Sequence, residues 1–568
     1  MGTISDKLMR IINTKEDIRQ ALRSKGYDVP TSIPFKEYAK MILDLPCKED
    51  SFPDIEGIVA RYSASGITNE QMAANPVWVD KTGNGYDLQL KNFSWKGMSG
   101  VGGYGDENHQ TFYKFTLDDY VFIATPPGVK HMNFTFRVTG LQPGNKLTLA
   151  FFGTTNTVYG TWDKDGIYTV NSAVVEVGKP VYFYNGYGAT RGEFTIEILP
   201  LYPGFILGDG VDDFAVTEKE LNFEDTYTVY TAFIPFQNNP TRNMILCGAD
   251  SKKTFSMQYS SLVYVSFIAG NNYYINADFV NGLNLFACKR NGNNICIKNL
   301  LTNKVVTGTC GDWVENAGLY YLWKNATYAS FAKAAIAGQT ICNGYFSTDE
   351  DDEKVLDWYK KQYPWLFPDQ AWTVVGKTNE DKDRATIANI TGNGNDLVLS
   401  NFGFAEGSGY NEEGEYAGYL VTDGVDDRVV SSSFTLNKDW TIVGNWKMLQ
   451  PEANKLSGIV KQNSLFIYNH VDGLNISIND AWNFFKLKDI RSVNAICSDG
   501  RIYLNDWTEI IDSKQQTVNE SVGTLVIGIL GNVYTSLAFK NLGFYNNQNL
   551  SKDDCIKAYN YLQTLKAK

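Results

Sequence analysis

The sequence predicts a mainly β protein of several domains with a short helical segment at its N-terminus. The composition is one reason: 34 Tyr, 32 Phe and 50 Gly among 568 residues suit strands and tight turns. A second reason is an internal repeat, because motifs from the first half recur in the same order in the second. The length agrees, since about 150 residues per domain gives roughly four folded units.

Charge and hydropathy exclude two classes of function. The net charge is −12 at pH 7, whereas a nucleic-acid binder needs clustered basic charge. No apolar run approaches the roughly 20 residues of a membrane helix. Charged residues such as Asp6, Lys7 and Arg10 interrupt the N-terminal apolar runs, so we expect no signal peptide. We therefore predict no nucleic-acid partner, no membrane insertion and no export by the ordinary secretory route.

Residues 1–50 carry the helical pattern. Ile4, Leu8 and Ile11 recur at helical spacing, and Tyr38 and Ile42 belong to a later stripe. Helices this short cannot bury their apolar stripes alone, so they need a partner surface or copies of themselves. We predict a docking or oligomerising module at 1–50, with a dimer or trimer as the expected assembly. The alternative is a helical cap packed on the chain's own β domain.

The repeat is defined by short motifs in matching order. Two hairpins are also predicted, because Asn-Gly and Asp-Gly supply the positive φ angles of tight turns. Each copy then closes with an acidic helix start. The matching segments are 66–70 with 376–380, 82–93 with 391–402, 209–213 with 423–427, 291–299 with 499–505, and 348–359 with 551–562.

The first copy contains an insertion. It is longer than the second by about 95 residues between Phe93 and Asp209, which is the size of a domain. Alternating apolar residues inside it, such as Phe134, Phe136 and Val138, predict a small β-sandwich. The predicted domains are the helical module at 1–50, a first β domain at 55–370, an inserted sandwich at 105–202 and a second β domain at 372–568.

The two repeats resemble laminin-G-like and concanavalin-A-like jelly rolls. The resemblance lies in the Asp-Gly-Val-Asp-Asp segments, in the hairpin leading to Ile502-Tyr503-Leu504-Asn505, and in the closing acidic helix. It implies two antiparallel sandwiches that bind glycans or protein ligands through loops at one edge, in some members with calcium.

The opening stretch resembles the N-terminal module of bacteriophage fibre and appendage proteins, especially those of crAss-like phages. The matching residues are Ile12-Asn13-Thr14-Lys15, Ile18-Arg19-Gln20-Ala21, Lys25-Gly26 and Phe35-x-x-Tyr38-Ala39. The resemblance implies an attachment element followed by β-rich binding domains. It also implies a virion protein that is assembled in the host cytoplasm, with residues 1–50 held by a capsid or other virion protein.

Two features suggest binding chemistry. Carboxylates are the ligands calcium prefers, and they sit beside a glycine turn in both repeats, but turn-forming acids on the surface are the commoner case. Tyr and Trp rings can stack on sugars, although many of them fill sandwich cores. The calcium candidates are Asp209, Asp212, Asp213, Asp423, Asp426 and Asp427. The carbohydrate candidates are Trp95, Tyr104, Tyr184, Tyr187, Tyr273, Tyr274, Tyr410 and Tyr416.

Catalysis is not expected. No complete constellation of paired acids, or of a nucleophile with its base, stands out, and the acidic run 349–353 fits a helix N-terminus. No CxxC pair indicates zinc. Cys288 and Cys296 flank a predicted hairpin turn, and their bonding state stays open.

These observations predict a structural virion protein without an enzymatic activity or cofactor, apart from the calcium option. The expected form is a capsid head fibre that displays carbohydrate-binding domains to host-surface or mucus glycans through multivalent contacts. The alternatives are a phage tail fibre that binds the receptor, a tail-borne polysaccharide depolymerase and a bacterial adhesin.

Overall fold

The computed structural model describes most of the chain after residue 51. Ile55–Lys568 is the second of two compact units of the chain, and the helices predicted for 1–50 lie outside the described residues. The described parts are 52–103, 114–117, 120–124, 131–151, 157–174, 181–186, 193–236, 244–249, 255–259, 264–268, 274–278, 280, 282–312, 317–324, 331–414, 416–449, 457–462, 465–470, 473–478, 493–511, 521–527, 529–530, 533–534 and 536–567.

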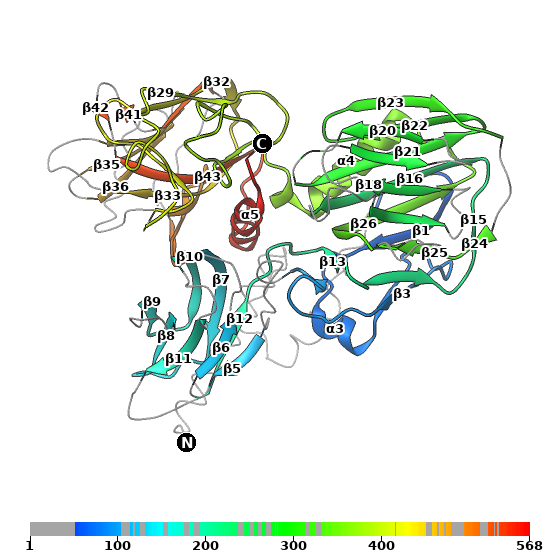
Figure 1. Ribbon diagram of the computed structural model, residues 1–568, viewed down its shortest axis with the longest axis horizontal. Coiled ribbons are helices and arrows are strands. Elements are labelled where there is room, and N and C mark those ends of the chain that lie inside the picture. Colours follow the sequence, from blue (N-terminus) through cyan, green and yellow to red (C-terminus); the bar gives the residue numbers. More distant parts are fainter. Residues whose placement is uncertain are drawn as a thin grey trace, which may run out of the picture. The chain divides into compact units, whose positions relative to one another are not determined.

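The predicted fold class is confirmed, because the second unit is built from antiparallel sheets (Figure 1). The first sandwich has two large sheets in its described residues. One contains, in order, β23 (Lys304–Thr309), β22 (Asn294–Asn299), β21 (Asn284–Asn291), β16 (Thr226–Pro235), β26 (Lys333–Asn343), β13 (Ile206–Asp209) and β4 (Gly100–Val101), with β1 (Ile58–Ser63) beside β26. The other contains β2 (Val77–Trp78), β3 (Leu88–Lys91), β14 (Phe214–Thr217), β25 (Tyr320–Leu322), β17 (Met244–Ala249), β18 (Ser256–Tyr259), β19 (Tyr264–Ile268) and β20 (Tyr274–Asp278). A small pair is formed by β15 (Leu221–Asn222) and β24 (Ala317–Gly318).

The second sandwich repeats this plan. One sheet contains β30 (Gly409–Asn411), β31 (Tyr419–Val421), β43 (Leu537–Asn546), β33 (Trp440–Met448), β37 (Val493–Cys497), β38 (Arg501–Leu504) and β39 (Glu509–Ile511), with β27 (Gln370–Thr373) beside β43. The other contains β28 (Thr386–Ile387), β29 (Leu397–Ser400), β32 (Arg428–Leu436), β40 (Ser521–Ile527), β34 (Ser457–Gln462), β35 (Leu465–His470) and β36 (Gly473–Ile478). A short pair is formed by β41 (Ile529–Leu530) and β42 (Val533–Tyr534).

The insertion has sheets of its own. One contains β10 (Gly166–Val174), β7 (His131–Thr139), β12 (Phe194–Ile198) and β5 (Lys114–Leu117), and the other β6 (Tyr120–Ala124), β11 (Val181–Gly186), β8 (Lys146–Phe151) and β9 (Thr157–Trp162). The alternating residues Phe134, Phe136 and Val138 lie buried in its core, because alternate side chains of a strand face the same side.

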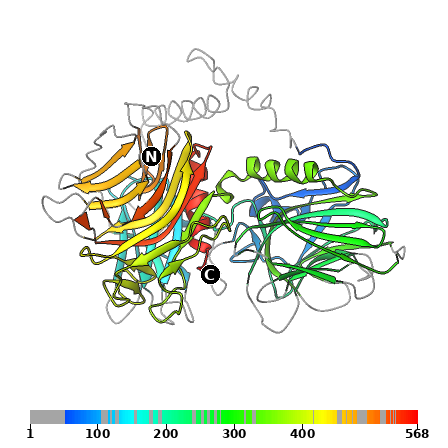
Figure 2. The same cartoon turned by 90° about the horizontal axis from the view of Figure 1, so that it is seen from above.

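Helices complete each sandwich. The helix α3 (Asn69–Ala74) opens the first copy, α4 (Asp349–Gln362) closes it with η1 (Pro364–Leu366) behind it, and α5 (Lys552–Thr564) closes the second. Figure 2 shows α4 along one face of the first sandwich. The acidic helix starts are confirmed, since Thr348 and Ser551 are N-caps whose hydroxyls accept the third backbone N–H of the helix. None of the helices described here is long and apolar enough to cross a membrane.

Both hairpins are confirmed, with a shift in the first. Asn291 pairs with Asn294, so Gly292 and Asn293 form the two-residue turn rather than Asn291 and Gly292. Gly292 has a φ of 56°, the left-handed value that such a turn requires. In the second hairpin the N–H of Gly500 donates to the carbonyl of Cys497.

The register also answers the question of the cysteine pair. Cys288 pairs with Ile297, and Cys296 pairs with Lys289. Neighbouring residues of a strand face opposite sides of the sheet, so Cys288 and Cys296 do not face each other. Both are free thiols, and Cys288 is fully buried in the core of the first sandwich.

Candidate functional site

The recurring motifs fasten turns to strands. Thr82 and Asn84 donate side-chain hydrogen bonds of 3.2 and 3.0 Å to the carbonyl of Val59. In the second copy, Thr391 and Asn393 bind the carbonyl of Asp369 in the same way, at 3.3 and 2.9 Å. The Thr-Gly-Asn-Gly motif therefore recurs because it anchors the same turn in both sandwiches.

The asparagine of each Thr-Asn-Glu motif binds a neighbouring strand. Asn69 accepts from the N–H of Val101 at 2.7 Å and donates to its carbonyl at 3.0 Å. Asn379 binds Tyr410 with two bonds of 2.8 Å. A side chain on Gly100 would put its Cβ 2.7 Å from Asn69 Oδ1, so a glycine is needed beside this clamp.

The acidic turns are built alike in the two copies. Asp209 Oδ1 accepts from the N–H groups of Val211 at 2.7 Å and Asp212 at 3.4 Å, while Asp213 Oδ2 accepts from the N–H of Asp209 at 3.0 Å. Asp423 and Asp427 make the same bonds within their turn. These oxygens close the turn and leave Asp213 fully buried.

The acidic turns offer calcium a small set of ligands. In each copy, one oxygen from each of three aspartates lies within 4.8 Å of the others: Asp209, Asp212 and Asp213, and Asp423, Asp426 and Asp427. Calcium takes six to eight oxygens, and several of these already accept backbone N–H groups. The three carboxylates alone do not make a complete site, and calcium binding stays a prediction.

Burial changes the titration of these turns. It raises the pKa of Asp213 to about 7, with a further contribution from the charge of Asp209. Burial also raises the pKa of Asp427, to about 6. A carboxyl group removed from water loses the hydration that favours its charged form.

The aromatic candidates whose side chains are described are half-buried, apart from Tyr410. Trp95 is half-buried and stacks on Phe93 at a centroid distance of 5.3 Å, and Tyr184 is half-buried and stacks on Tyr182 at 5.5 Å. The candidate Tyr416 is half-buried. Tyr274 begins strand β20. The candidates Tyr104, Tyr187 and Tyr273 lie outside the described residues.

Tyr410 requires a correction. Its side chain is 2% exposed and belongs to the core of the second sandwich. The hydroxyl donates to the carbonyl of Arg384 at 2.7 Å. A ring whose faces pack against core residues cannot stack on a sugar, so Tyr410 is not a carbohydrate contact.

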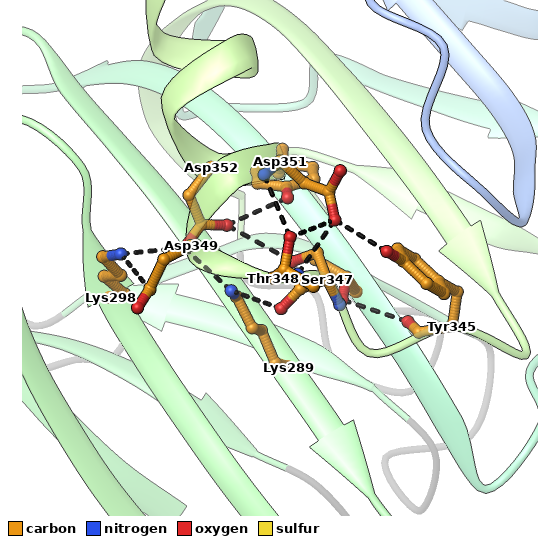
Figure 3. Close-up of polar contacts among 10 residues, drawn as sticks. Lys289, Lys298, Tyr345, Ser347, Thr348, Asp349, Asp351 and Asp352 are labelled. Atoms are coloured by element: carbon orange, nitrogen blue, oxygen red, sulfur yellow. Dashed lines mark hydrogen bonds and ion pairs between the residues drawn. The ribbon is translucent and has the colours of Figure 1, made fainter.

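The acidic start of α4 is a buried ion network (Figure 3). Asp352 Oδ2 lies 2.8 Å from Lys289 Nζ and 3.0 Å from Lys298 Nζ. Tyr230 donates to Asp352 Oδ1 at 2.9 Å, and Ser347 Oγ lies 3.3 Å from the same oxygen. Asp352 is 2% exposed. Both of its oxygens are engaged, so this network holds the helix on the sheet.

A cavity of about 230 Å³ lies where the two sandwiches adjoin. It is lined by apolar side chains from both copies and by the polar groups of Lys360, Asp369, Thr391 and Asn393. Lys360 is exposed on α4, and burial raises the pKa of Asp369. A concave apolar site with a few convergent polar groups is the usual form of a small-ligand site.

The sequence reasoning did not find this cavity. Its walls come from segments far apart in the chain: Val280, Leu283, Leu301, Leu356, Leu366, Phe367, Pro368, Ile390, Tyr561 and Leu565. One contact across the junction is direct, because the N–H of Leu283 donates to the Tyr561 hydroxyl at 3.0 Å. No spacing motif signals such a junction, since neither copy contains the site alone.

No family model and no curated protein matches this sequence. Among solved structures, the botulinum neurotoxin serotype D binding domain aligns at 9% identity over 87% of this chain and 98% of its own, with a TM-score of 0.28. The botulinum neurotoxin type G receptor binding domain aligns at 11% identity over 61% and 93%, with a TM-score of 0.27. The exoplasmic domain of VIP36 with Ca²⁺ and Man3GlcNAc aligns at 10% identity over 28% and 85%, with a TM-score of 0.20. At these scores the likeness decides nothing about function.

Proposed function

We propose that this chain is a glycan-binding structural protein of a phage particle, a head fibre that acts by adhesion and not by catalysis. The observation that carries glycan binding is the junction cavity. Its volume of about 230 Å³ lies below the roughly 300–1,000 Å³ of sites for drug-sized ligands. It fits a single sugar unit, with apolar walls for the ring face and polar groups for the hydroxyls.

The polar groups of the cavity suit a sugar. Lys360 supplies donors, and Asp369 supplies a carboxylate whose Oδ2 already accepts from the N–H of Asn546 at 2.6 Å. Asn393 donates to the Asp369 carbonyl through Nδ2, and its amide oxygen can accept from a hydroxyl. A cation, a carboxylate and an amide among the lining groups can orient a ligand that carries several hydroxyls.

The phage part of the proposal is supported by the resemblance of residues 7–45 to fibre attachment modules. A fibre that carries several weak glycan sites gains avidity through multivalency. The particle test is gold-labelled antibody against residues 372–568 on purified phage. Label over the capsid supports a head fibre, label at the tail end replaces it with a tail fibre, and unlabelled particles overturn the virion assignment.

Glycan binding is tested with the full chain on a glycan array, followed by titration of the retained sugars. We expect Val280→Trp, which fills the cavity, and Lys360→Ala, which removes a polar group, to weaken binding by tenfold or more. Lys361→Ala is the matched control, because Lys361 is exposed on the same helix and does not line the cavity. Retention unchanged in both cavity variants would overturn the proposal.

A further inference from the structure

A buried lysine interrupts the central strand of the second sandwich. Strand β43 pairs with β33 through Asn445 with Asn541 and Trp446 with Phe539, which leaves Lys540 at a bulge between them. Lys540 is 4% exposed. Among the described residues its ammonium group forms no ion pair and no hydrogen bond, and its contact is with an aromatic ring. A buried charge of this kind is costly unless something compensates it.

The surroundings of Lys540 are cationic and aromatic. Lys540 Nζ and Lys447 Nζ each lie 5.4 Å from the ring centroid of Tyr419, and Lys447 Nζ lies 5.8 Å from that of Tyr416. The Tyr419 hydroxyl donates to Asn445 Oδ1 at 3.0 Å, so this side chain from β31 crosses β43 to reach β33. The two ammonium groups therefore share one aromatic ring.

The electrostatics favour an anion here. Burial, and then the charge of Lys447, lowers the pKa of Lys540 to about 8. Cation–π contacts offset only a part of the cost of a desolvated ammonium group. A bound anion would compensate the buried ammonium group of Lys540 and stabilise its charged form.

The first sandwich shows that the bulge does not require a lysine. In the equivalent pairing, Ala232 faces Gly338 and Phe233 faces Ile336, so Ala337 occupies the bulge. The N–H of Ala64 donates to the Ala337 carbonyl as that of Val374 does to Lys540. The lysine is thus an addition to the shared framework.

The residues around the bulge are also apolar in the first sandwich and polar or charged in the second. By the same registers, Phe205 and Ile234 stand in the first copy where Tyr419 and Lys447 stand in the second. Phe205 packs on Tyr363 and Trp365 at centroid distances of 6.3 and 6.4 Å. An apolar contact in one sandwich is a cationic and aromatic one in the other.

We propose that Lys540, Lys447 and Tyr419 form a binding site for the carboxylate of an acidic sugar, with the half-buried Tyr416 as a ring face beside it. The ammonium group of Lys540 is a charged donor for a carboxylate, and a tyrosine ring suits the C–H face of a sugar. This proposal rests on the proposed function in taking the anion from a glycan, but it uses residues away from the junction cavity.

The test is isothermal titration of the full chain at pH 7 with methyl glucuronide, methyl glucoside and sodium acetate. We expect the glucuronide to bind more tightly than both other probes, and Lys540→Ala to weaken it at least tenfold. The alanine variant should fold, because the first sandwich carries Ala337 at this bulge. Lys438→Ala is the control, since Lys438 is exposed on the same sandwich. A thermal melt of each variant verifies folding.

Each outcome has a distinct meaning. Glucuronide binding that persists in Lys540→Ala overturns the site, and acetate binding as tight as the glucuronide overturns the assignment to an acidic sugar. If Lys540→Ala loses glucuronide binding and keeps glycan binding at the cavity, the Lys540 site is supported. Val280→Trp tests the cavity alone. Glucuronide affinity should also fall as pH rises past about 8. Above that pH Lys540, which lies beside Lys447 and Tyr419, loses its proton and its charge.

Discussion

The two sandwiches hold their closing helices by different chemistry at the same positions. In the first, Lys289 on β21 pairs with Asp352 on α4 and also donates to the Ser347 carbonyl at 2.9 Å. In the second sandwich, the strand register places Cys497 at the position of Lys289. Cys555 lies four residues after the N-cap Ser551, as Asp352 lies four residues after the N-cap Thr348. An ion pair in one copy is a thiol pair in the other.

The contact around the pair is otherwise preserved. The thiols of Cys497 and Cys555 both lie 3.9 Å from the Leu550 carbonyl, which matches the bond from Lys289 to the Ser347 carbonyl. The motifs that recur in both sandwiches fasten turns. The positions at which the two sandwiches differ lie between the closing helix and its sheet, or around Lys540. Repeated motifs therefore mark the scaffold, and the positions that diverge are the better guide to function.

The largest expected effect comes from the ion pair. Asp352→Ala leaves Lys289 and Lys298 buried without their shared carboxylate, and we expect a loss of about 3–5 kcal/mol in unfolding free energy. Cys555→Ala, at the matching position, removes a small group and leaves no charge, so about 1 kcal/mol is expected. Urea unfolding of both variants measures the contrast.

Asp349→Asn is the control for that contrast. Asp349 also pairs with Lys298, at 2.6 Å, but its side chain is 88% exposed. An exposed ion pair contributes about 0–1 kcal/mol. Equal losses of unfolding free energy in Asp352→Ala and Cys555→Ala would show that the buried charge makes no difference between the two helix–sheet contacts.

The asparagine clamps test what the copies share. Asn69→Ala leaves the N–H and carbonyl of Val101 without these partners, which costs about 1–3 kcal/mol. Asn379→Ala should cost the same or slightly less, because Asn379 is half-buried while Asn69 is 2% exposed. Differential scanning calorimetry of the two variants provides the comparison. A clamp that mattered in one copy alone would contradict the shared role of the motif.

Much of this architecture follows from local sequence. Alternation in the insertion gave its strands, and Thr348 and Ser551 marked the helix starts, because these signals act over a few residues. The cavity and the Lys540 site depend on registers between distant strands. The sequence does contain a clue to the Lys540 site, because Lys540 interrupts an apolar strand at a position where the first sandwich has Ala337. Only the strand register shows that these two positions are equivalent.

The smallest expected difference between the copies is in their acidic turns. The Ser408 hydroxyl donates to Asp427 Oδ1 at 3.1 Å and lowers its pKa. Asp213 Oδ1 has no hydrogen bond of normal geometry in the described residues, although the nearby Ser99 lowers its pKa in part. Carbon-13 NMR of the carboxyl groups should find Asp213 titrating near 7 and Asp427 near 6.

Both pKa values lie above the ordinary value of an aspartate, so each carboxyl binds its proton more tightly in the folded state. Stability should therefore fall as pH rises from about 4 through the folded pKa, and Asp213→Asn should remove that part of the dependence. Millimolar calcium should leave both titrations unchanged, because the three carboxylates of each turn supply fewer oxygens than the six to eight that calcium takes. If calcium lowered both pKa values together, the aspartates would be ligands in both copies, and the turns would be paired cation sites rather than paired fasteners.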